Sequence, residues 1–389
     1  MSIDESQVTS AVAAVTDPEL RRPLGELGMV ESVQVKRKKV TIGVALPVGH
    51  YPQVDELVNR VRQAVGPFPG VDEVVIETVV MEEEPRARLR MLLRGEPLDG
   101  GEQAIDHDHG HGHSGQLGHE DGRPNRFMLP QSKTRIIGVS SGKGGVGKSS
   151  VTVNLAVALA RMGHDVGILD ADVYGFSVPK MLGVTADPLI IGDLVIPPTA
   201  NGVRCLSMGF FVPDDTPVIW RGPMLHKALE QFLVDAYWGE PDFLLIDMPP
   251  GTGDVTLSLG QYLTKTEVFV VTTPQPAAQR VAQRSAYAAR KLKLSVRGVI
   301  ENMSWFTGDD GARYELFGAG GGQQLAEELG VPLLAQVPLV PTLRQGGDEG
   351  IPVVVAEPDG EVAAVFNQLA TTIAGLGPAR VYRKELTVR

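Results

Sequence analysis

Cysteine is almost absent from this chain of 389 residues, which contains only Cys205. A single thiol excludes a disulfide within the chain. Proteins without disulfides are typical of reducing compartments, so we expect a cytoplasmic protein. Cys205, in the stretch RCLSM over 204–208, is predicted to be a thiol buried in the core.

The chain also lacks long hydrophobic runs and an excess of positive charge. No apolar run reaches the length of a membrane span, and the first residues, MSIDE, do not resemble a signal peptide. A formal net charge of −11, without a basic stripe, argues against nucleic-acid binding. The tail over 376–389 is basic but has no convincing apolar face, so we expect no stable membrane association.

The composition that remains, 43% hydrophobic and 21% charged, is that of a globular protein, and the length suggests two domains. We predict a small α+β domain over 1–95, an ATPase-type domain over 131–375 and a short tail over 376–389. In the first domain, helices are expected near 8–15, 54–65 and 84–94, and strands near 30–35, 40–46 and 71–80.

Residues 96–130 are predicted to form a flexible linker, because they are rich in Gly, Asp, Glu and His and poor in large apolar side chains. The linker holds five histidines: His107, His109, His111, His113 and His119. Alternating histidines can bind a divalent metal weakly. A solvated tract that binds metal only adventitiously is the simpler interpretation, and the sequence leaves both open.

From residue 131 to 375, short apolar runs alternate with helical stretches. This alternation predicts an α/β fold of the P-loop NTPase type, with a doubly wound, mainly parallel sheet covered on both faces. The predicted strands are 134–140, 166–169, 203–207, 243–246, 268–271, 298–301 and 333–337, and the main helices are 150–162, 224–236, 277–291 and 322–329. Ligands of such sheets bind at the carboxyl ends of the strands.

A glycine-rich loop, GKGGVGKS over 142–149, lies between a predicted strand and a predicted helix and fits the pattern G-x-x-x-x-G-K-[ST]. Its glycines let backbone N–H groups surround a polyphosphate, Lys148 reaches the β- and γ-phosphates, and the Ser149 hydroxyl binds Mg²⁺. A second lysine, Lys143, lies inside the loop. The predicted nucleotide contacts are Gly142, Gly144, Gly145, Val146, Gly147, Lys148, Ser149 and Ser150.

Polar side chains also follow other predicted strands. Of Asp170 and Asp172, one can support Mg²⁺ while the other orients an attacking water; a solvated turn is the alternative. Asp247 ends the apolar run FLLI, where a bound Mg²⁺ would compensate its burial. Asn302 reads the edge of a base or is a turn residue. Pro338 lies where the last strand would open beside that base.

These motifs together resemble those of known proteins. Lys143 in KGGVGKS, the DAD motif at 170–172 and Asp247 with PPGTGD resemble the deviant Walker A ATPases of the ParA/MinD class. LDADVYG, WRGPM, MPPGTGD and ENMS more narrowly resemble the Mrp/ApbC family of ATP-dependent iron-sulfur cluster carriers. DPEL at 17–20 and LGELGMV at 24–30 are similar to the small iron-sulfur assembly domain often fused to that family.

The resemblance implies ATP and Mg²⁺ as cofactors, iron-sulfur clients or scaffolds as partners, and a homodimer. In that dimer Lys143 would reach the nucleotide of the partner subunit as a charge clamp. The other implied roles are phosphate and Mg²⁺ binding by Lys148 and Ser149, support of the Mg²⁺ shell by Asp170 and Asp247, orientation of the hydrolytic water by Asp172, and an adenine contact by Asn302.

Two departures from the family concern cluster ligands. Many members carry a C-x-x-C pair after ENM, where this chain reads SWFTGDDG over 304–311. The N-terminal domain often has Cys-Pro, where this chain has Tyr51-Pro52. Because two copies supply only two thiolates, the [4Fe–4S] cluster that the family implies is excluded here in its four-thiolate form.

We therefore predict an Mrp-like protein that binds ATP, hydrolyses it slowly and acts in iron-sulfur cluster assembly or transfer without C-x-x-C ligands. One alternative is a regulatory or positioning switch of the ParA/MinD type that acts through ATP-dependent dimerisation. Another is an ATPase for metal insertion or client maturation, supplied with metal by the linker histidines.

Overall fold

The computed structural model describes residues 4–96, 125–172, 175–211, 222–251 and 253–377. Most of the predicted linker and tail, including the five linker histidines, lies outside this part of the chain. The chain divides into two compact units, 1–114 together with 188–196, and 115–187 together with 197–389.

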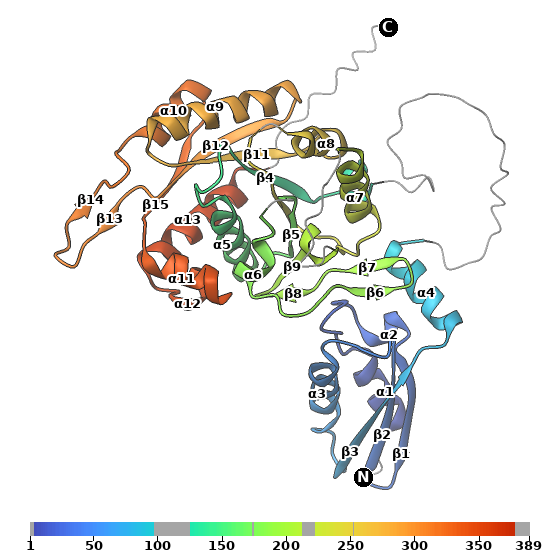
Figure 1. Ribbon diagram of the computed structural model, residues 1–389. Coiled ribbons are helices and arrows are strands. Elements are labelled where there is room, and N and C mark those ends of the chain that lie inside the picture. Colours follow the sequence, from blue (N-terminus) through green and yellow to red (C-terminus); the bar gives the residue numbers. More distant parts are fainter. Residues whose placement is uncertain (1–3, 97–124, 173–174, 212–221, 252, 378–389) are drawn as a thin grey trace, which may run out of the picture. The chain divides into compact units, whose positions relative to one another are not determined.

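The first unit is built on a three-stranded sheet in the order β1(Val30–Lys36), β2(Lys39–Leu46) and β3(Glu73–Val80) (Figure 1). β1 is antiparallel to β2, whereas β2 and β3 are parallel. Alternate residues of β2, among them Val40, Ile42 and Val44, are buried on one face, as the two-residue period of a strand requires. The helices of the unit are α1(Glu5–Ala13), α2(Leu24–Leu27), α3(Val54–Val65) and α4(Glu83–Arg94).

A hairpin from much later in the chain also belongs to the first unit. Its strands, β6(Leu189–Ile191) and β7(Leu194–Ile196), pair antiparallel across Gly192 and Asp193. Asp193 forms an ion pair of 2.7 Å with Arg94, the last residue of α4. The predicted domain boundaries, 1–95 and 131–375, assign this hairpin to the second domain.

A buried carboxylate organises the loop after α1. Asp17 is fully buried, and its Oδ1 accepts hydrogen bonds from the backbone N–H groups of Glu19 and Leu20 and from the Tyr51 hydroxyl, at 2.7 to 2.9 Å. Its Oδ2 is buried without a hydrogen-bond partner among the described residues. Burial raises the pKa of Asp17 despite these hydrogen bonds, because a charged carboxylate loses its hydration there.

We expect Asp17→Asn to gain stability relative to the wild type as pH rises. The folded-state pKa of Asp17 lies above 3.8, so the wild type loses stability between pH 3.8 and that raised pKa. Asparagine keeps an Oδ1 acceptor and does not titrate, so the variant escapes this loss. Calorimetric unfolding of both proteins at pH 4.5 and pH 8 measures the change, with Asp72→Asn as an exposed control. If the difference in stability between Asp17→Asn and the wild type were the same at both pH values, the prediction would be contradicted.

The second unit contains an eight-stranded sheet in the order β15-β12-β11-β4-β10-β5-β9-β8. The first seven of these are parallel, and β8 pairs antiparallel with β9 at one edge. The strands are β4(Arg135–Ser141), β5(Val166–Asp170), β8(Thr199–Ala200), β9(Val203–Ser207), β10(Phe243–Asp247), β11(Glu267–Thr272), β12(Ser295–Asn302) and β15(Leu333–Val337). The predicted mainly parallel α/β fold is confirmed.

Helices cover both faces of this sheet. Val268 and Val270 of β11 belong to one buried cluster with side chains of α9(Pro276–Lys291) and α10(Gly321–Leu329). The intervening Phe269 and Val271 belong to the other cluster, with α5(Lys148–Arg161) and α13(Glu361–Gly375) (Figure 1). The remaining helices are α6(Val178–Leu182), α7(Gly222–Val234), α8(Asp254–Tyr262), α11(Pro341–Glu349) and α12(Val353–Ala356), with short 3₁₀ turns at Arg126–Met128 and Met208–Phe211.

Among the described helices, none is both long enough and apolar enough to cross a membrane. Cys205 lies on β9 and is fully buried, as predicted. The parallel register places the ends of neighbouring strands side by side, so that Asp247 of β10 is paired with Asp170 of β5. The carboxyl edge of the sheet is therefore where the predicted functional residues meet.

Candidate functional site

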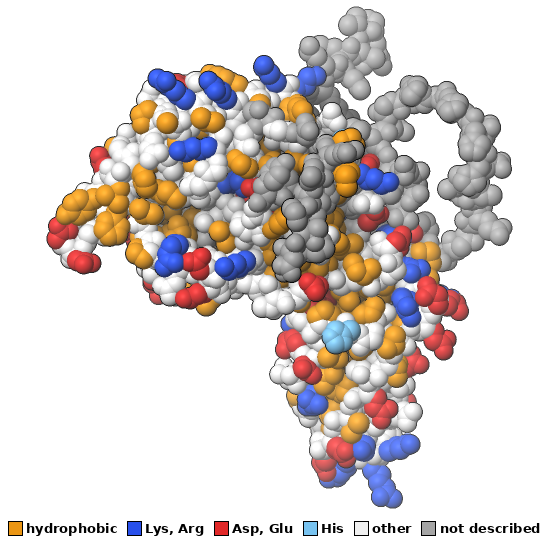
Figure 2. Space-filling model, in the orientation of Figure 1, with side chains coloured by type: hydrophobic (Ala, Val, Ile, Leu, Met, Phe, Trp, Pro, Cys, Tyr) orange, Lys and Arg blue, Asp and Glu red, His pale blue; other side chains and the backbone are white. Residues whose placement is uncertain are grey.

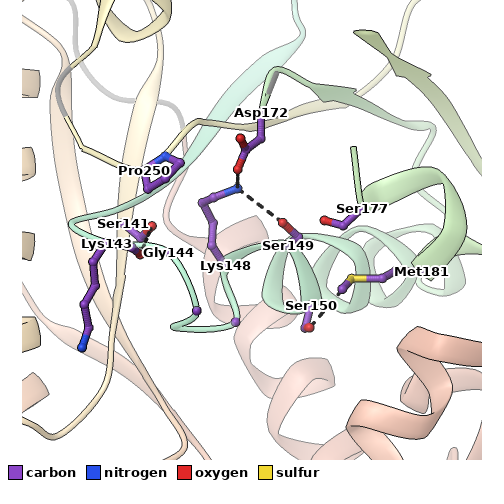
Figure 3. Close-up of a pocket in the computed structure, with 12 residues that line it drawn as sticks. Ser141, Lys143, Gly144, Lys148, Ser149, Ser150, Asp172, Ser177, Met181 and Pro250 are labelled. Atoms are coloured by element: carbon purple, nitrogen blue, oxygen red, sulfur yellow. Dashed lines mark hydrogen bonds and ion pairs between the residues drawn. The ribbon is translucent and has the colours of Figure 1, made fainter. Parts of the chain in front are cut away.

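The glycine-rich loop joins β4 to α5 and lines a pocket of about 240 Å³ (Figure 3). Gly145 and Gly147 have φ angles of 78° and 79°, which glycine adopts without steric cost. Gly142 has no room for a side chain, since a Cβ atom there would lie 2.2 Å from the backbone nitrogen of Ala282. The predicted contact residues that line the pocket are Gly144, Gly145, Gly147, Lys148, Ser149 and Ser150.

The centre of the site is a hydrogen-bonded carboxylate. Asp247 is fully buried, and its Oδ2 lies 2.5 Å from Lys148 Nζ and accepts a hydrogen bond of 2.6 Å from the Ser149 hydroxyl. The Thr152 hydroxyl donates to Oδ1 at 2.7 Å. Lys148 also lies 3.5 Å from Asp172, so one buried ammonium group is shared by two carboxylates. This geometry brings together the ammonium, hydroxyl and carboxylate groups that bind phosphate and a divalent cation.

Asp170 is paired with Asp247 across the neighbouring strands β5 and β10, and neither carboxylate is among the residues that line the pocket. Asp170 is fully buried and accepts hydrogen bonds from the Ser207 hydroxyl at 3.0 Å and from the backbone N–H of Asp172 at 3.2 Å. Burial, followed by the nearby charge of Asp247, raises the pKa of Asp170 to about 7. A second negative charge beside Asp247 is thus costly unless a cation compensates it.

Lys143 and Lys148 leave the loop in different directions. Figure 3 shows the Lys143 side chain pointing away from Lys148 and Asp172. Its Nζ lies 3.4 Å from the side-chain oxygen of Gln275, in the loop before α9. Lys143, Lys148 and Asp172 all line the pocket, but the charged end of Lys143 points away from the other two side chains.

A second pocket, of about 200 Å³, lies beside the loop and is lined by both Asn302 and Pro338. Asn302 is 2% exposed, and its amide nitrogen donates a hydrogen bond of 2.9 Å to the backbone oxygen of Val146. Its Oδ1 is buried and has no hydrogen-bond partner among the described residues. An acceptor of this kind fits an exocyclic amino group such as that of adenine.

Several residues of these pockets were not predicted from the sequence. Met181 of α6 lines both of them, and Leu343 of α11 lines the second. An isolated methionine or leucine carries no pocket signal in a sequence, because its place depends on how α6 and α11 pack in three dimensions. Ser177 also lines the first pocket and was not predicted.

The region without the C-x-x-C pair forms a small hairpin of β13(Phe306–Thr307) and β14(Arg313–Tyr314). Asp310 accepts hydrogen bonds from the backbone N–H of Ala312 and the Tyr314 hydroxyl, at 3.0 and 2.8 Å. The Arg313 guanidinium lies 4.3 Å from the ring centre of Trp305. Hydrophobic side chains gather over this hairpin in Figure 2. These contacts connect the turn and the two strands of the hairpin.

Within the described residues, no three His, Cys, Asp or Glu side chains converge in a way that would hold a metal ion. Cys205 is buried on β9. The residues present therefore do not fit a cluster held by four thiolates of this chain or of two copies of it.

A parallel sheet with a phosphate-binding loop after β4 and carboxylates at the ends of β5 and β10 defines the class of P-loop nucleotide-binding proteins. A family model described as NUBPL iron-transfer P-loop NTPase, of the ParA group, matches residues 132–374. A second model, described as iron-sulfur cluster assembly protein, matches residues 5–76. The chain belongs to the NUBPL iron-transfer P-loop NTPase family.

Relatives and solved structures agree with this family. A protein of Mycobacterium leprae named iron-sulfur cluster carrier protein is 43% identical over 94% of this chain and 91% of its own length. A Bacillus subtilis protein of the same name is 41% identical over 87% of this chain and 88% of its own length. A nucleotide-binding protein of Archaeoglobus fulgidus, solved in complex with ADP, is 33% identical, with a TM-score of 0.51 over 60% of this chain and 91% of that protein.

Proposed function

We propose that this protein binds Mg·ATP, hydrolyses it slowly to ADP and phosphate, and acts in the assembly or transfer of iron-sulfur clusters. The ATPase proposal rests above all on Lys148 and Ser149, which line the loop pocket and both contact the Asp247 carboxylate. The two family matches and the names of the relatives support the iron-sulfur role. They favour this function over a positioning switch of the ParA/MinD type.

In this proposal, Lys148 moves from its carboxylate partners to the β- and γ-phosphates. Mg²⁺ would be held by the Ser149 hydroxyl and the Asp247 carboxylate, with Asp170 behind them, and would neutralise charge on the phosphates. Asp172, which lines the pocket 3.5 Å from Lys148, would orient the attacking water. The free acceptor of Asn302 accepts a hydrogen bond from the adenine amino group, beside Pro338.

We further propose a cytoplasmic homodimer that works with iron-sulfur clients or scaffold proteins. Lys143, whose side chain points away from Lys148 and Asp172, would act on the nucleotide of the partner subunit. Because the chain lacks four available thiolates, a cluster would be bound through other ligands or contributed by a partner protein.

The proposal is tested by anaerobic reconstitution with iron and sulfide, combined with ATPase assays on the same protein. We expect phosphate release that requires Mg²⁺ and is lost in Lys148→Ala. Stoichiometric iron and sulfide would support direct cluster carriage through ligands other than four thiolates. A bare protein that still hydrolyses ATP would contradict direct carriage, and a protein without turnover would contradict the ATPase.

A further inference from the structure

The β6–β7 hairpin is a piece of the chain that lies between two elements of the second unit but belongs to the first. It follows α6 and precedes β8, yet residues 188–196 form one compact unit with 1–114. Because residues 188–196 belong to the first unit, the chain connects this unit to the nucleotide pockets a second time. This connection is separate from the one through residues 97–124.

The hairpin is fixed within the first unit by its turn. Asp193 lies 2.7 Å from Arg94, whose side chain is 12% exposed. Gly192 has a φ angle of 67°, and a Cβ atom there would lie 2.2 Å from an Arg90 guanidinium nitrogen. Arg90 in turn is 3.3 Å from Glu83, so the turn lies against side chains that are themselves held in place on α4.

One face of the hairpin is fully covered. Four side chains share this face, because the register pairs residue 189 with 196 and residue 191 with 194. They are between 0% and 8% exposed: Leu189, Ile191, Leu194 and Ile196. A two-stranded hairpin is at best marginally stable by itself, so packing rather than its own hydrogen bonds holds it in place.

The segment 177–196, which ends with the hairpin, begins in the nucleotide site. Ser177 and Met181 line the phosphate pocket, and Met181 also lines the second pocket. Helix α6 is followed by Gly183, which has a φ angle of 77°. A Cβ atom at this position would lie 2.3 Å from the backbone oxygen of Gly350, the residue that follows α11. α6 therefore touches both pockets, and its end is packed too closely to move without affecting α11.

The connection between these two ends is short. Residues 183–188 separate α6 from β6, and six extended residues span at most about 20 Å. We propose that the segment 177–196 couples nucleotide binding to the N-terminal unit, with the docked hairpin restraining the residues that connect it to α6. This proposal rests on the nucleotide binding proposed above.

The coupling has a direct thermodynamic reason. When the hairpin is docked, residues 183–188 are restrained at both ends, so nucleotide binding costs less conformational entropy. Coupling between two sites is reciprocal, so a bound nucleotide must stabilise the docked hairpin by the same factor. Breaking the Arg94–Asp193 pair is therefore expected to weaken nucleotide binding, although neither residue lines either of the two pockets described above.

The test measures the dissociation constant of Mg·ADP by calorimetry in the full-length protein. We expect Arg94→Asp and Asp193→Arg each to raise it by about fivefold or more, and the double exchange to restore it. Asp193→Ala, at a side chain that is 57% exposed, provides a mild variant that keeps the fold. Lys38→Asp, which breaks an exposed ion pair with Asp72 in the same unit, is the matched control and should leave the constant unchanged.

Hydrogen exchange gives an independent readout. With Mg·ADP bound, the amides of 83–94 and 189–196 should exchange more slowly in the wild type and not in Arg94→Asp. Wild-type affinity in all three single variants, with no change in exchange at these amides, would overturn the coupling while leaving nucleotide binding intact. A wild type that binds no Mg·ADP would instead overturn the proposed function on which the coupling rests.

Discussion

Replacing Lys143 with alanine is expected to reduce ATP turnover by about a thousandfold or more while the nucleotide still binds. A positive charge supplied across an interface to a phosphoryl transition state contributes about 10³ to 10⁵ in rate. Lys143 points away from Lys148 and is 3.4 Å from Gln275, so its removal leaves the phosphate-binding groups of its own subunit in place. Steady-state phosphate release and equilibrium binding of ATP measure the two effects separately.

A mixing experiment distinguishes action across subunits from action within one. Lys143→Ala retains Lys148, and Lys148→Ala retains Lys143, so a mixture of the two inactive proteins should regain part of the turnover. Lys291→Ala, at an exposed lysine on α9, is the matched control and should behave as the wild type. Undiminished turnover in Lys143→Ala, or no recovery in the mixture, would contradict the role across the interface.

Replacing Asp247 with alanine is expected to destabilise the second unit strongly. Lys148 is 6% exposed and would lose its closest partner, and removing one member of a buried ion pair costs about 3–5 kcal/mol. The hydroxyls of Ser149 and Thr152 would lose their acceptor as well. In a domain of this size each kcal/mol shifts the melting temperature by about 2–4 °C, so a fall of about 10 °C is expected by calorimetry.

Two further variants identify the cause of that fall. Asp247→Asn keeps an acceptor for Thr152 but removes the charge, so a similar fall would assign the effect to the unpaired Lys148. Asp187→Ala, at an exposed aspartate of the second unit, should leave the melting temperature unchanged. A stable Asp247→Ala protein would show that Asp172 alone, 3.5 Å away, suffices as the partner of Lys148.

The sequence predicted the phosphate-binding loop and its carboxylates because each lies directly after an apolar strand. In a parallel sheet, chain order and strand period alone bring such residues to one edge, as the pairing of Asp247 with Asp170 illustrates. Met181 and Leu343 could not be found in this way, because α6 and α11 meet through packing between segments far apart in the chain. The unpaired Oδ1 of Asn302 likewise depends on its contact with Val146.

The β6–β7 hairpin could be predicted from the sequence in part: its turn could, but its place in the first unit could not. LIIGDLVI over 189–196 contains a usable signal, since Gly-Asp between two apolar runs is typical of a two-residue hairpin turn. Nothing in those residues indicates that the hairpin joins a unit whose other elements end at Arg94. Membership of a compact unit is set by tertiary partners, here Arg94 and Arg90, and a local pattern does not encode it.

Because the β6–β7 hairpin belongs to the first unit, that unit cannot be completed during synthesis until residue 196 has been translated. Asp193 is translated about 100 residues after its partner Arg94. At about 5–20 residues per second, the ribosome needs roughly 5–20 s to make that stretch. The N-terminal unit thus leaves the ribosome first, but its last two strands, β6 and β7, follow only after the phosphate-binding loop has been made.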